Sequence, residues 1–142
     1  MKVSDAMTRG ASIARPDETV REIARRMAAE DIGFMPVGDH DRLVGAITDR
    51  DIAVRAVAQG RGPDTPVREI MTPDVKYCFD DEDMAHVVQN MGNVQLRRLP
   101  VVDRDKRLVG VVSLADGALK DSPEVVGIAL SGVVVPGRAA AA

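Results

Sequence analysis

The stretch Asp17–Val37 reads DETVREIARRMAAEDIGFMPV, and Asp81–Val101, which begins 64 residues later, reads DEDMAHVVQNMGNVQLRRLPV. The two stretches align without a gap, and apolar positions match apolar positions along their length. The identical residues are Asp17 and Asp81, Glu18 and Glu82, Met27 and Met91, Pro36 and Pro100, and Val37 and Val101. Because chance agreement would not preserve this pattern, the sequence indicates an internal repeat.

The repeat extends on both sides of these stretches. Met7-Thr8 matches Met71-Thr72 at the same offset. After one inserted residue, Arg42–Gly45 matches Arg107–Gly110. An insertion is tolerated in a surface turn. We therefore expect the extra residue to lie in a turn.

Each repeat begins with a predicted helix. Thr19 followed by Glu22 is typical of a capping box, and apolar residues at 20, 23, 24, 27 and 28 then share one helical face. The second copy starts near Asp83 and places Met84, Val87, Val88 and Met91 on the same stripe. Its cap is weaker because His86 stands where the first copy has glutamate.

A predicted β-hairpin follows each helix. Its strands are Phe34–Val37 and Leu43–Thr48 in the first copy, and Leu99–Val102 and Leu108–Ser113 in the second. These runs are nearly all apolar, which is typical of strands covered on both faces, so we expect helices to pack over them. A second helix should follow each hairpin, and the first, Asp51–Gln59, should end at Gly60. Short strands should precede the first helices, around residues 11–14 and 75–79.

The predicted fold is therefore α/β (α+β), with two βαββα repeats packed about a pseudo-two-fold axis. Residues 1–60 form the first repeat, 61–66 a linker, 67–120 the second repeat, and 121–142 a tail that is either a dimer contact or disordered. Neither half can bury its sheet alone. We expect clefts along the join of the two repeats.

Composition excludes several classes of function. The formal net charge of −3 and the aromatic content of 2% disfavour a nucleic-acid binder. The single cysteine, Cys78, cannot form an intramolecular disulfide, and residues 1–10 lack the apolar core of a secretory signal. The apolar stretch Val125–Val135 is far shorter than the ~20 residues needed to cross a bilayer. We expect a cytoplasmic protein that neither binds nucleic acid nor spans a membrane.

Each hairpin runs into the pattern G-x-h-[ST]-x-x-D, in which h is apolar: GAITDRD at Gly45–Asp51 and GVVSLAD at Gly110–Asp116. A hydroxyl with an acid three residues later can cap a helix reciprocally with no ligand. Alternatively, the hydroxyl and free backbone N–H groups at a strand-to-helix junction suit an anion, and the acid can accept hydrogen bonds from a ribose diol. Both interpretations stand for the two hydroxyl–acid pairs, Thr48 with Asp51 and Ser113 with Asp116.

The chain resembles a tandem CBS (cystathionine-β-synthase-type) domain pair, or Bateman module, over about Val3–Leu119. The resemblance rests on the duplicated motifs: both G-x-h-[ST]-x-x-D segments, Ala6-Met7-Thr8 with Ile70-Met71-Thr72, and Met35-Pro36-Val37 with Leu99-Pro100-Val101. The stretch ITDRDI, Ile47–Ile52, is similar to small stand-alone bacterial CBS proteins, including those of hypoxia and general stress responses.

This resemblance implies a regulatory module that binds an adenosyl ligand (AMP, ADP, ATP, NAD or S-adenosylmethionine) between the repeats, usually as a homodimer. By analogy, Asp51 and Asp116 would hold ribose hydroxyls, and Thr48 and Ser113 would touch ribose or phosphate. Arg97, Arg98 and Arg50 are phosphate candidates. The first copy has Gly33 and Phe34 where the second has Arg97 and Arg98, so the two clefts should be unequal. Adenine would lie against Met35, Pro36, Val37, Leu99, Pro100 and Val101, with the strands after Thr8 and Thr72; all six residues are also natural core positions.

Catalysis has little support in the sequence. His40 and His86 lack a Ser or Cys partner at a recognisable spacing, and Cys78 lies on a predicted strand. Asp39-His40-Asp41 lacks the paired spacing that zinc prefers. We therefore predict no catalytic cofactor, no metal and no enzyme activity, with an adenine nucleotide as regulatory ligand and an unknown effector protein as partner. The alternatives are a ligand-free interaction scaffold and a metal-responsive stress protein of the same fold.

Overall fold

The structure is a computed structural model, and it describes residues 1–94, 97–120, 124, 127, 128 and 130. Contacts between residues divide the chain into two compact units. Unit 1 comprises Met1–Ala11 and Lys76–Ala142, and unit 2 comprises Ser12–Val75. The prediction for the tail, residues 121–142, falls almost wholly outside the described residues.

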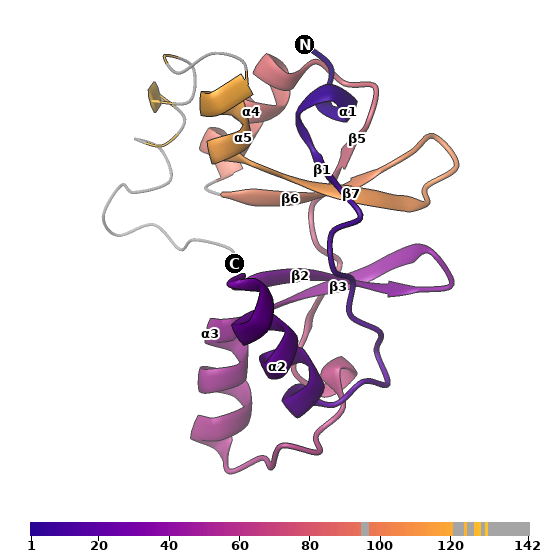
Figure 1. Ribbon diagram of the computed structural model, residues 1–142, viewed down its shortest axis with the longest axis vertical. Coiled ribbons are helices and arrows are strands. Elements are labelled where there is room, and N and C mark those ends of the chain that lie inside the picture. Colours follow the sequence, from indigo (N-terminus) through magenta and orange to yellow (C-terminus); the bar gives the residue numbers. More distant parts are fainter. Residues whose placement is uncertain (95–96, 121–123, 125–126, 129, 131–142) are drawn as a thin grey trace. The chain divides into compact units, whose positions relative to one another are not determined.

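Unit 2 contains the helix and the hairpin of the first repeat (Figure 1). Helix α2 spans Val20–Glu30, and strands β2 and β3 span Phe34–Asp39 and Arg42–Thr48. The helical segment after β3 consists of α3 (Asp49–Asp51), the π-helical η1 (Ile52–Ala56) and the 3-10 turn η2 (Val57–Gln59). The 3-10 turn η3 (Val67–Glu69) and strand β4 (Thr72–Pro73) complete the unit. The sheet order is β2–β3–β4, with antiparallel pairs.

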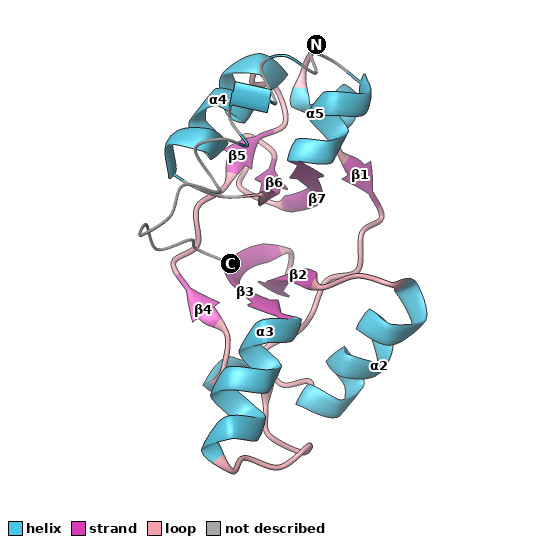
Figure 2. Ribbon diagram, turned by 90° about the vertical axis from the view of Figure 1, so that its left-hand side faces the viewer, coloured by secondary structure: helices cyan, strands magenta, loops and turns pink. Residues whose placement is uncertain are grey.

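Unit 1 contains the second copy of this arrangement. Its elements are α1 (Val3–Ala6), β1 (Thr8–Arg9), β5 (Cys78–Phe79), α4 (Met84–Val94), β6 (Arg98–Val102), β7 (Leu108–Ser113) and α5 (Leu114–Lys120). The sheet order is β1–β7–β6–β5, in which β5 runs parallel to β6 and the other pairs are antiparallel. Helices α4 and α5 lie on one face of this sheet (Figure 2). The predicted α+β class is thus confirmed, with one sheet in each unit.

Local signals in the sequence set the ends of these elements. Thr19 and Glu22 form the predicted capping box at the start of α2. The hairpin turn between β2 and β3 is the pair His40 and Asp41, both with positive φ (50° and 65°), which matches the twist of a two-residue hairpin. The segment after β3 ends at Gly60 with φ of 73°, as predicted, but it begins at Asp49 and contains a π-helical stretch that no pattern indicated.

The sheets take their edge strands from outside their own repeat. Strand β4 follows the linker in sequence but pairs with β3, and β1 precedes the first helix but pairs with β7. Because of this exchange, the two compact units do not coincide with the two sequence repeats: residues 1–11 belong to the unit that contains the second repeat. The strand expected at 11–14 is only a single bridge from Ala14 to Val37, and the strand expected at 75–79 is reduced to β5.

The motif glycines make this pairing possible. A Cβ atom on Gly45 would come within 2.7 Å of the Thr72 carbonyl oxygen, and one on Gly110 would come within 2.7 Å of the Thr8 carbonyl oxygen. Both distances are far below van der Waals contact, so the edge strands approach closer than any side chain would permit. This close approach is a physical reason for glycine at the start of each motif.

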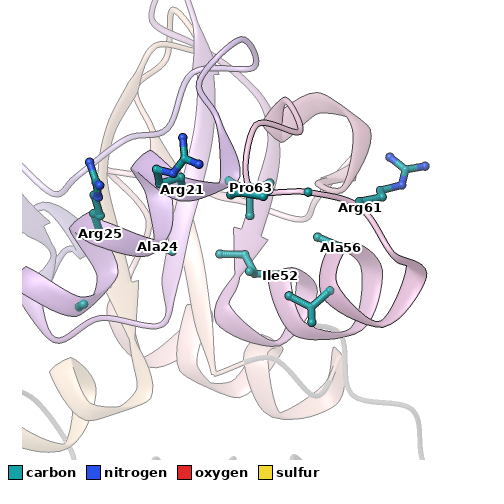
Figure 3. A pocket seen from close by; sticks show the side chains of 11 residues that line it. Arg21, Ala24, Arg25, Ile52, Ala56, Arg61 and Pro63 are labelled. Carbon is teal, nitrogen blue, oxygen red and sulfur yellow. The ribbon is translucent and has the colours of Figure 1, made fainter.

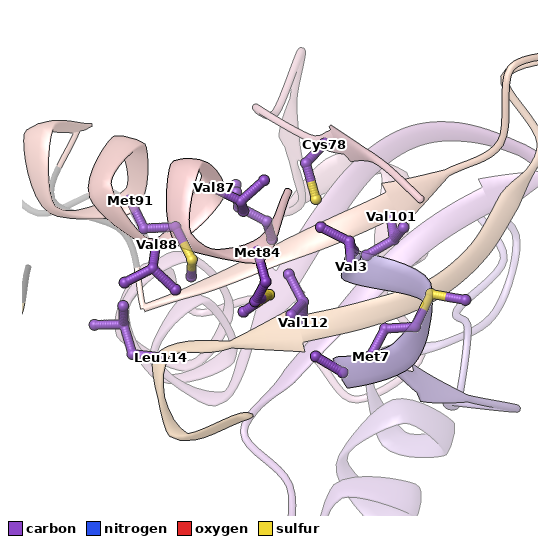
Figure 4. Packing of buried hydrophobic residues seen from close by; sticks show 12 residues of the cluster. Val3, Met7, Cys78, Met84, Val87, Val88, Met91, Val101, Val112 and Leu114 are labelled. Carbon is purple, nitrogen blue, oxygen red and sulfur yellow. The ribbon is translucent and has the colours of Figure 1, made fainter. Parts of the chain in front are cut away.

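Each unit has its own aliphatic core. In unit 2, Val20, Ile23 and Met27 of α2 pack with the β2 and β3 side chains, as the helical spacing predicts. In unit 1, Met84, Val87, Val88 and Met91 of α4 pack against β6 and β7 (Figure 4). Methionine and branched aliphatic side chains fill the space that aromatic rings fill elsewhere. In β2, all residues from Phe34 to Gly38 are buried, so both faces of that strand are covered.

Candidate functional site

Both hydroxyl–acid pairs form reciprocal caps. The Asp51 backbone N–H donates to Thr48 Oγ1 (3.1 Å), and the Thr48 N–H donates to Asp51 Oδ2 (2.9 Å). Asp116 N–H donates to Ser113 Oγ (3.1 Å), and Ser113 N–H donates to Asp116 Oδ2 (2.9 Å). The helix-capping interpretation of the motif is therefore confirmed for both copies. In each cap the acid accepts one hydrogen bond, through its carboxylate oxygen Oδ2.

Burial differs between the two pairs. Thr48 and Asp51 are 8% and 6% exposed, whereas Ser113 and Asp116 are half-buried. A buried carboxylate is costly unless it is hydrogen-bonded and paired with an opposite charge. The second oxygen of Asp51, Oδ1, lies 3.7 Å from Arg55 Nε. The Asp51 carboxylate is therefore held from two sides.

Arg55 is a residue that sequence reasoning missed. Its guanidinium Nη1 donates to Thr72 Oγ1 (3.0 Å) and to the Ile70 carbonyl (3.3 Å). Arg55 thus links the acid of the first motif to the segment that carries Met71-Thr72. The available signal was the Asp–Arg spacing of four residues on a predicted helix, which places the two side chains on one face.

The three arginines proposed from sequence are exposed. The register of β6 and β7 pairs Arg98 with Ser113, and the Leu114 N–H donates to the Arg97 carbonyl (3.0 Å). Both arginines therefore lie at the Ser113 end of their hairpin. Arg50 lies one residue before Asp51. Within the described residues, none of these three guanidinium groups has an ion-pair partner.

The apolar candidates divide between two faces of their strands. Met35 and Val37 belong to the core cluster of unit 2, and Leu99 and Val101 belong to that of unit 1. Because side chains alternate along a strand, Pro36 and Pro100 lie on the opposite faces. The core interpretation is confirmed for the four aliphatic residues, and the two prolines, although they lie on the opposite faces, are buried as well.

A cavity of about 440 Å³ lies between α2 and the helical segment after β3. Figure 3 shows the guanidinium groups of Arg21, Arg25 and Arg61 pointing away from Ile52 and Ala56. The remaining lining residues are Val20, Ala24, Ala28, Val57, Gly62 and Pro63. Neither Thr48 nor Asp51 lines this cavity, so it is separate from the hydroxyl–acid pair.

His40 and Cys78 lie in different environments. His40 is almost fully exposed and contacts Asp39, with 2.8 Å between Nδ1 and Oδ1. Over the described ranges, no three His, Cys, Asp or Glu side chains gather closely enough to hold a metal ion. Cys78 is 3% exposed, and burial, reinforced by Glu82 and Asp80, raises its pKa from 9.0 to about 12.

We expect Cys78 to resist alkylation in the folded protein at pH 8. The thiolate is the reactive form, and a pKa of about 12 leaves roughly one thiol in ten thousand ionised at that pH. Iodoacetamide labelling followed by mass spectrometry should therefore modify the chain only after urea unfolding. The same shift stabilises the fold fully below pH 9.0, and this contribution is lost as the pH rises toward about 12. Rapid labelling of the native chain would contradict this assignment.

None of the helices in the part of the chain that the structure describes has both the length and the apolar character needed to cross a bilayer.

Comparison with known proteins gives consistent matches. The family model described as CBS domain matches residues 3–57 and 67–116. The CBS domain-containing protein YhcV of Bacillus subtilis is 39% identical over 132 residues, which are 92% of this chain and 94% of that protein. A crystal structure of Hypoxic Response Protein I with two coordinated zinc ions is 34% identical, with a TM-score of 0.77 over 84% of this chain and 98% of that one. The CBS domain pair of protein MJ0100, in complex with 5′-methylthioadenosine and S-adenosyl-L-methionine, is 31% identical, with a TM-score of 0.75 over 87% of this chain and 98% of that one.

Proposed function

Because the chain belongs to the CBS domain family, with two repeats that match its model, we propose that it is a regulatory module that binds an adenosyl ligand. The ligand class comprises AMP, ADP, ATP, NAD and S-adenosylmethionine. The MJ0100 pair, which is 31% identical, was solved with two compounds of adenosyl type. This likeness supports the ligand class and leaves the individual ligand to experiment.

The observation that carries the proposal is the duplicated hydroxyl–acid pair. We name the two places the Thr48 site (Thr48 with Asp51) and the Ser113 site (Ser113 with Asp116). Each acid uses Oδ2 in its cap, so Oδ1 is the oxygen that would accept hydrogen bonds from a ribose diol; at Asp51 this oxygen also lies 3.7 Å from Arg55 Nε, beyond hydrogen-bond distance. The cap fixes the direction of the carboxylate before a ligand arrives, so binding costs little side-chain entropy.

Charged and apolar residues near these sites would hold the rest of the ligand. Arg97 and Arg98 have no ion-pair partner within the described residues and lie at the Ser113 end of the hairpin, which supports their role as phosphate ligands. Arg50 is the exposed cationic residue beside Asp51, and it has the acid Asp49 next to it. Adenine would lie along the h-P-V strands on the faces that carry Pro36 and Pro100, since the flanking aliphatic residues belong to the cores.

The proposed output is a change of conformational equilibrium rather than a reaction. A ligand shifts an equilibrium only through different affinities for two arrangements, and a tenfold difference is worth about 1.4 kcal/mol. We propose that an effector protein reads this change. The cytoplasmic location stays a prediction from sequence.

We further propose that the chain forms a homodimer through the face that contains the 440 Å³ cavity. Val57 beside it is 70% exposed, and the ion pairs Arg21–Asp64 (2.8 Å) and Arg61–Glu69 (3.9 Å) bring both signs of charge to this face. A two-fold interface must be self-complementary, and an apolar floor flanked by both charges meets that need. The occupant of the groove is therefore a second copy of the chain.

One set of measurements tests this function. Calorimetric titration with AMP, ATP, NAD and S-adenosylmethionine should give saturable heat with at least one compound. Light scattering on the same sample should give the mass of two chains. If no compound binds below millimolar concentration, the scaffold alternative holds and the motifs act only as helix caps. A mass of one chain would remove the dimer from the proposal.

A further inference from the structure

The two sites carry different charges at structurally equivalent positions. Phe34 pairs with Thr48 in the first hairpin, as Arg98 pairs with Ser113 in the second. The Asp49 N–H donates to the Gly33 carbonyl (3.0 Å), and the Leu114 N–H makes the same bond to Arg97 (3.0 Å). Asp49 therefore corresponds to Leu114, and Gly33 corresponds to Arg97, in space as well as in sequence.

At the Thr48 site the Asp49 carboxylate lies over Gly33. A Cβ atom on Gly33 would come within 2.9 Å of Asp49 Oδ2 and 3.1 Å of its Cγ. The missing side chain of Gly33 thus provides the space that the carboxylate occupies. The Arg50 N–H donates to Asp49 Oδ1 (2.8 Å), which fixes the carboxylate there. Asp49 is exposed and makes no ion pair within the described residues.

The Ser113 site has an apolar residue, Leu114, where the Thr48 site has Asp49, and it has a basic residue, Arg97, where the Thr48 site has Gly33. Leu114 is 5% exposed and belongs to the core of unit 1 (Figure 4). With no carboxylate over position 97, that position carries the exposed Arg97, followed by Arg98. The Ser113 site therefore presents two positive charges. The Thr48 site presents one, from Arg50, and Asp49 next to it cancels that charge.

We infer that Asp49 determines ligand selectivity, so that the two sites take adenosine compounds with different 5′ substituents. The Ser113 site takes a phosphate-bearing compound, because Arg97 and Arg98 offset its negative charge. The Thr48 site takes a compound whose 5′ substituent is neutral or cationic, because Asp49 repels phosphate. This inference rests on the proposed function and adds which chemical class each site accepts.

The test compares AMP with adenosine as probes of the Thr48 site. The binding of both is measured by calorimetry in a chain that carries Asp116→Asn, which weakens the Ser113 site. Adding Asp49→Asn should strengthen AMP binding about tenfold at low salt and leave adenosine binding unchanged. The gain should shrink at high ionic strength, because exposed charges are screened.

Asp41→Asn is the matched control. Asp41 is exposed, lies at the opposite end of the same hairpin, and has φ of 65°, which asparagine adopts readily. Asp41→Asn changes the net charge by the same amount as Asp49→Asn, and it should leave AMP binding unchanged. If adenosine binds but Asp49→Asn does not improve AMP binding, or the control improves it equally, the selectivity inference is wrong and the proposed function stands. If the wild-type chain binds no adenosyl compound, both are wrong.

Discussion

Asp51→Asn is expected to weaken adenosyl-ligand binding at the Thr48 site by about 10- to 100-fold, the range set by one charge-assisted hydrogen-bonded contact. Asparagine keeps the shape of the side chain and an oxygen that can accept from the Thr48 N–H, so the cap survives. Its other terminal group is an NH₂ donor, which cannot accept a hydrogen bond from a ribose hydroxyl. Asp116→Asn should have the same effect at the Ser113 site. Calorimetry with the ligand found in the screen measures both losses.

The capping box of α2 supplies the control for this experiment. Glu22→Gln makes the same acid-to-amide change in the pair with Thr19, where no ligand is proposed. It should leave ligand affinity unchanged, and its effect on urea unfolding should stay within that of a weakened cap, about 1 kcal/mol. Unaltered binding in both Asp51→Asn and Asp116→Asn would assign the motif acids to capping alone.

Gly45→Ala and Gly110→Ala are expected to destabilise the fold by about 1–3 kcal/mol each, the range for inserting a methyl group into a packed site. The methyl group added at Gly45 would need the space of the Thr72 carbonyl oxygen, 2.7 Å away, and of Met71 Sδ, 2.9 Å away. At Gly110 the obstacles are the Thr8 carbonyl oxygen and Met7 Sδ. Since the first obstacle is backbone in both cases, relief requires moving β4 or β1 away from its sheet.

Urea unfolding of each variant measures these losses. Gly62→Ala is the control, because no atom lies within 4 Å of its Cβ position and its backbone is not left-handed. It should change stability by no more than about 0.5 kcal/mol. An unfolding midpoint for Gly45→Ala equal to that of Gly62→Ala would show that β4 is not held against β3 as the structure has it.

Much of the candidate site could be predicted because its geometry is local. The spacing of three residues between Thr48 and Asp51 is enough to form the reciprocal cap, whatever the rest of the chain does. The roles of Met35 and Pro36 could not be separated in the same way. Their strand is apolar throughout, so its pattern does not show which face meets the core. The structure resolves this by placing Met35 in the core cluster of unit 2.

The sequence by itself determined the duplicated unit, its helices with their caps, and its hairpins, because each of these depends on residues within a few positions of one another or on a pattern present twice. Only the tertiary structure decided which segment completes each sheet, how Arg55 reaches Thr72, and that Asp49 occupies the space above Gly33. These contacts join segments whose sequences carry no mutual signal. The strand pairings form because an unpaired strand edge is costly, and Arg55 takes its position because the buried Asp51 carboxylate needs a compensating charge.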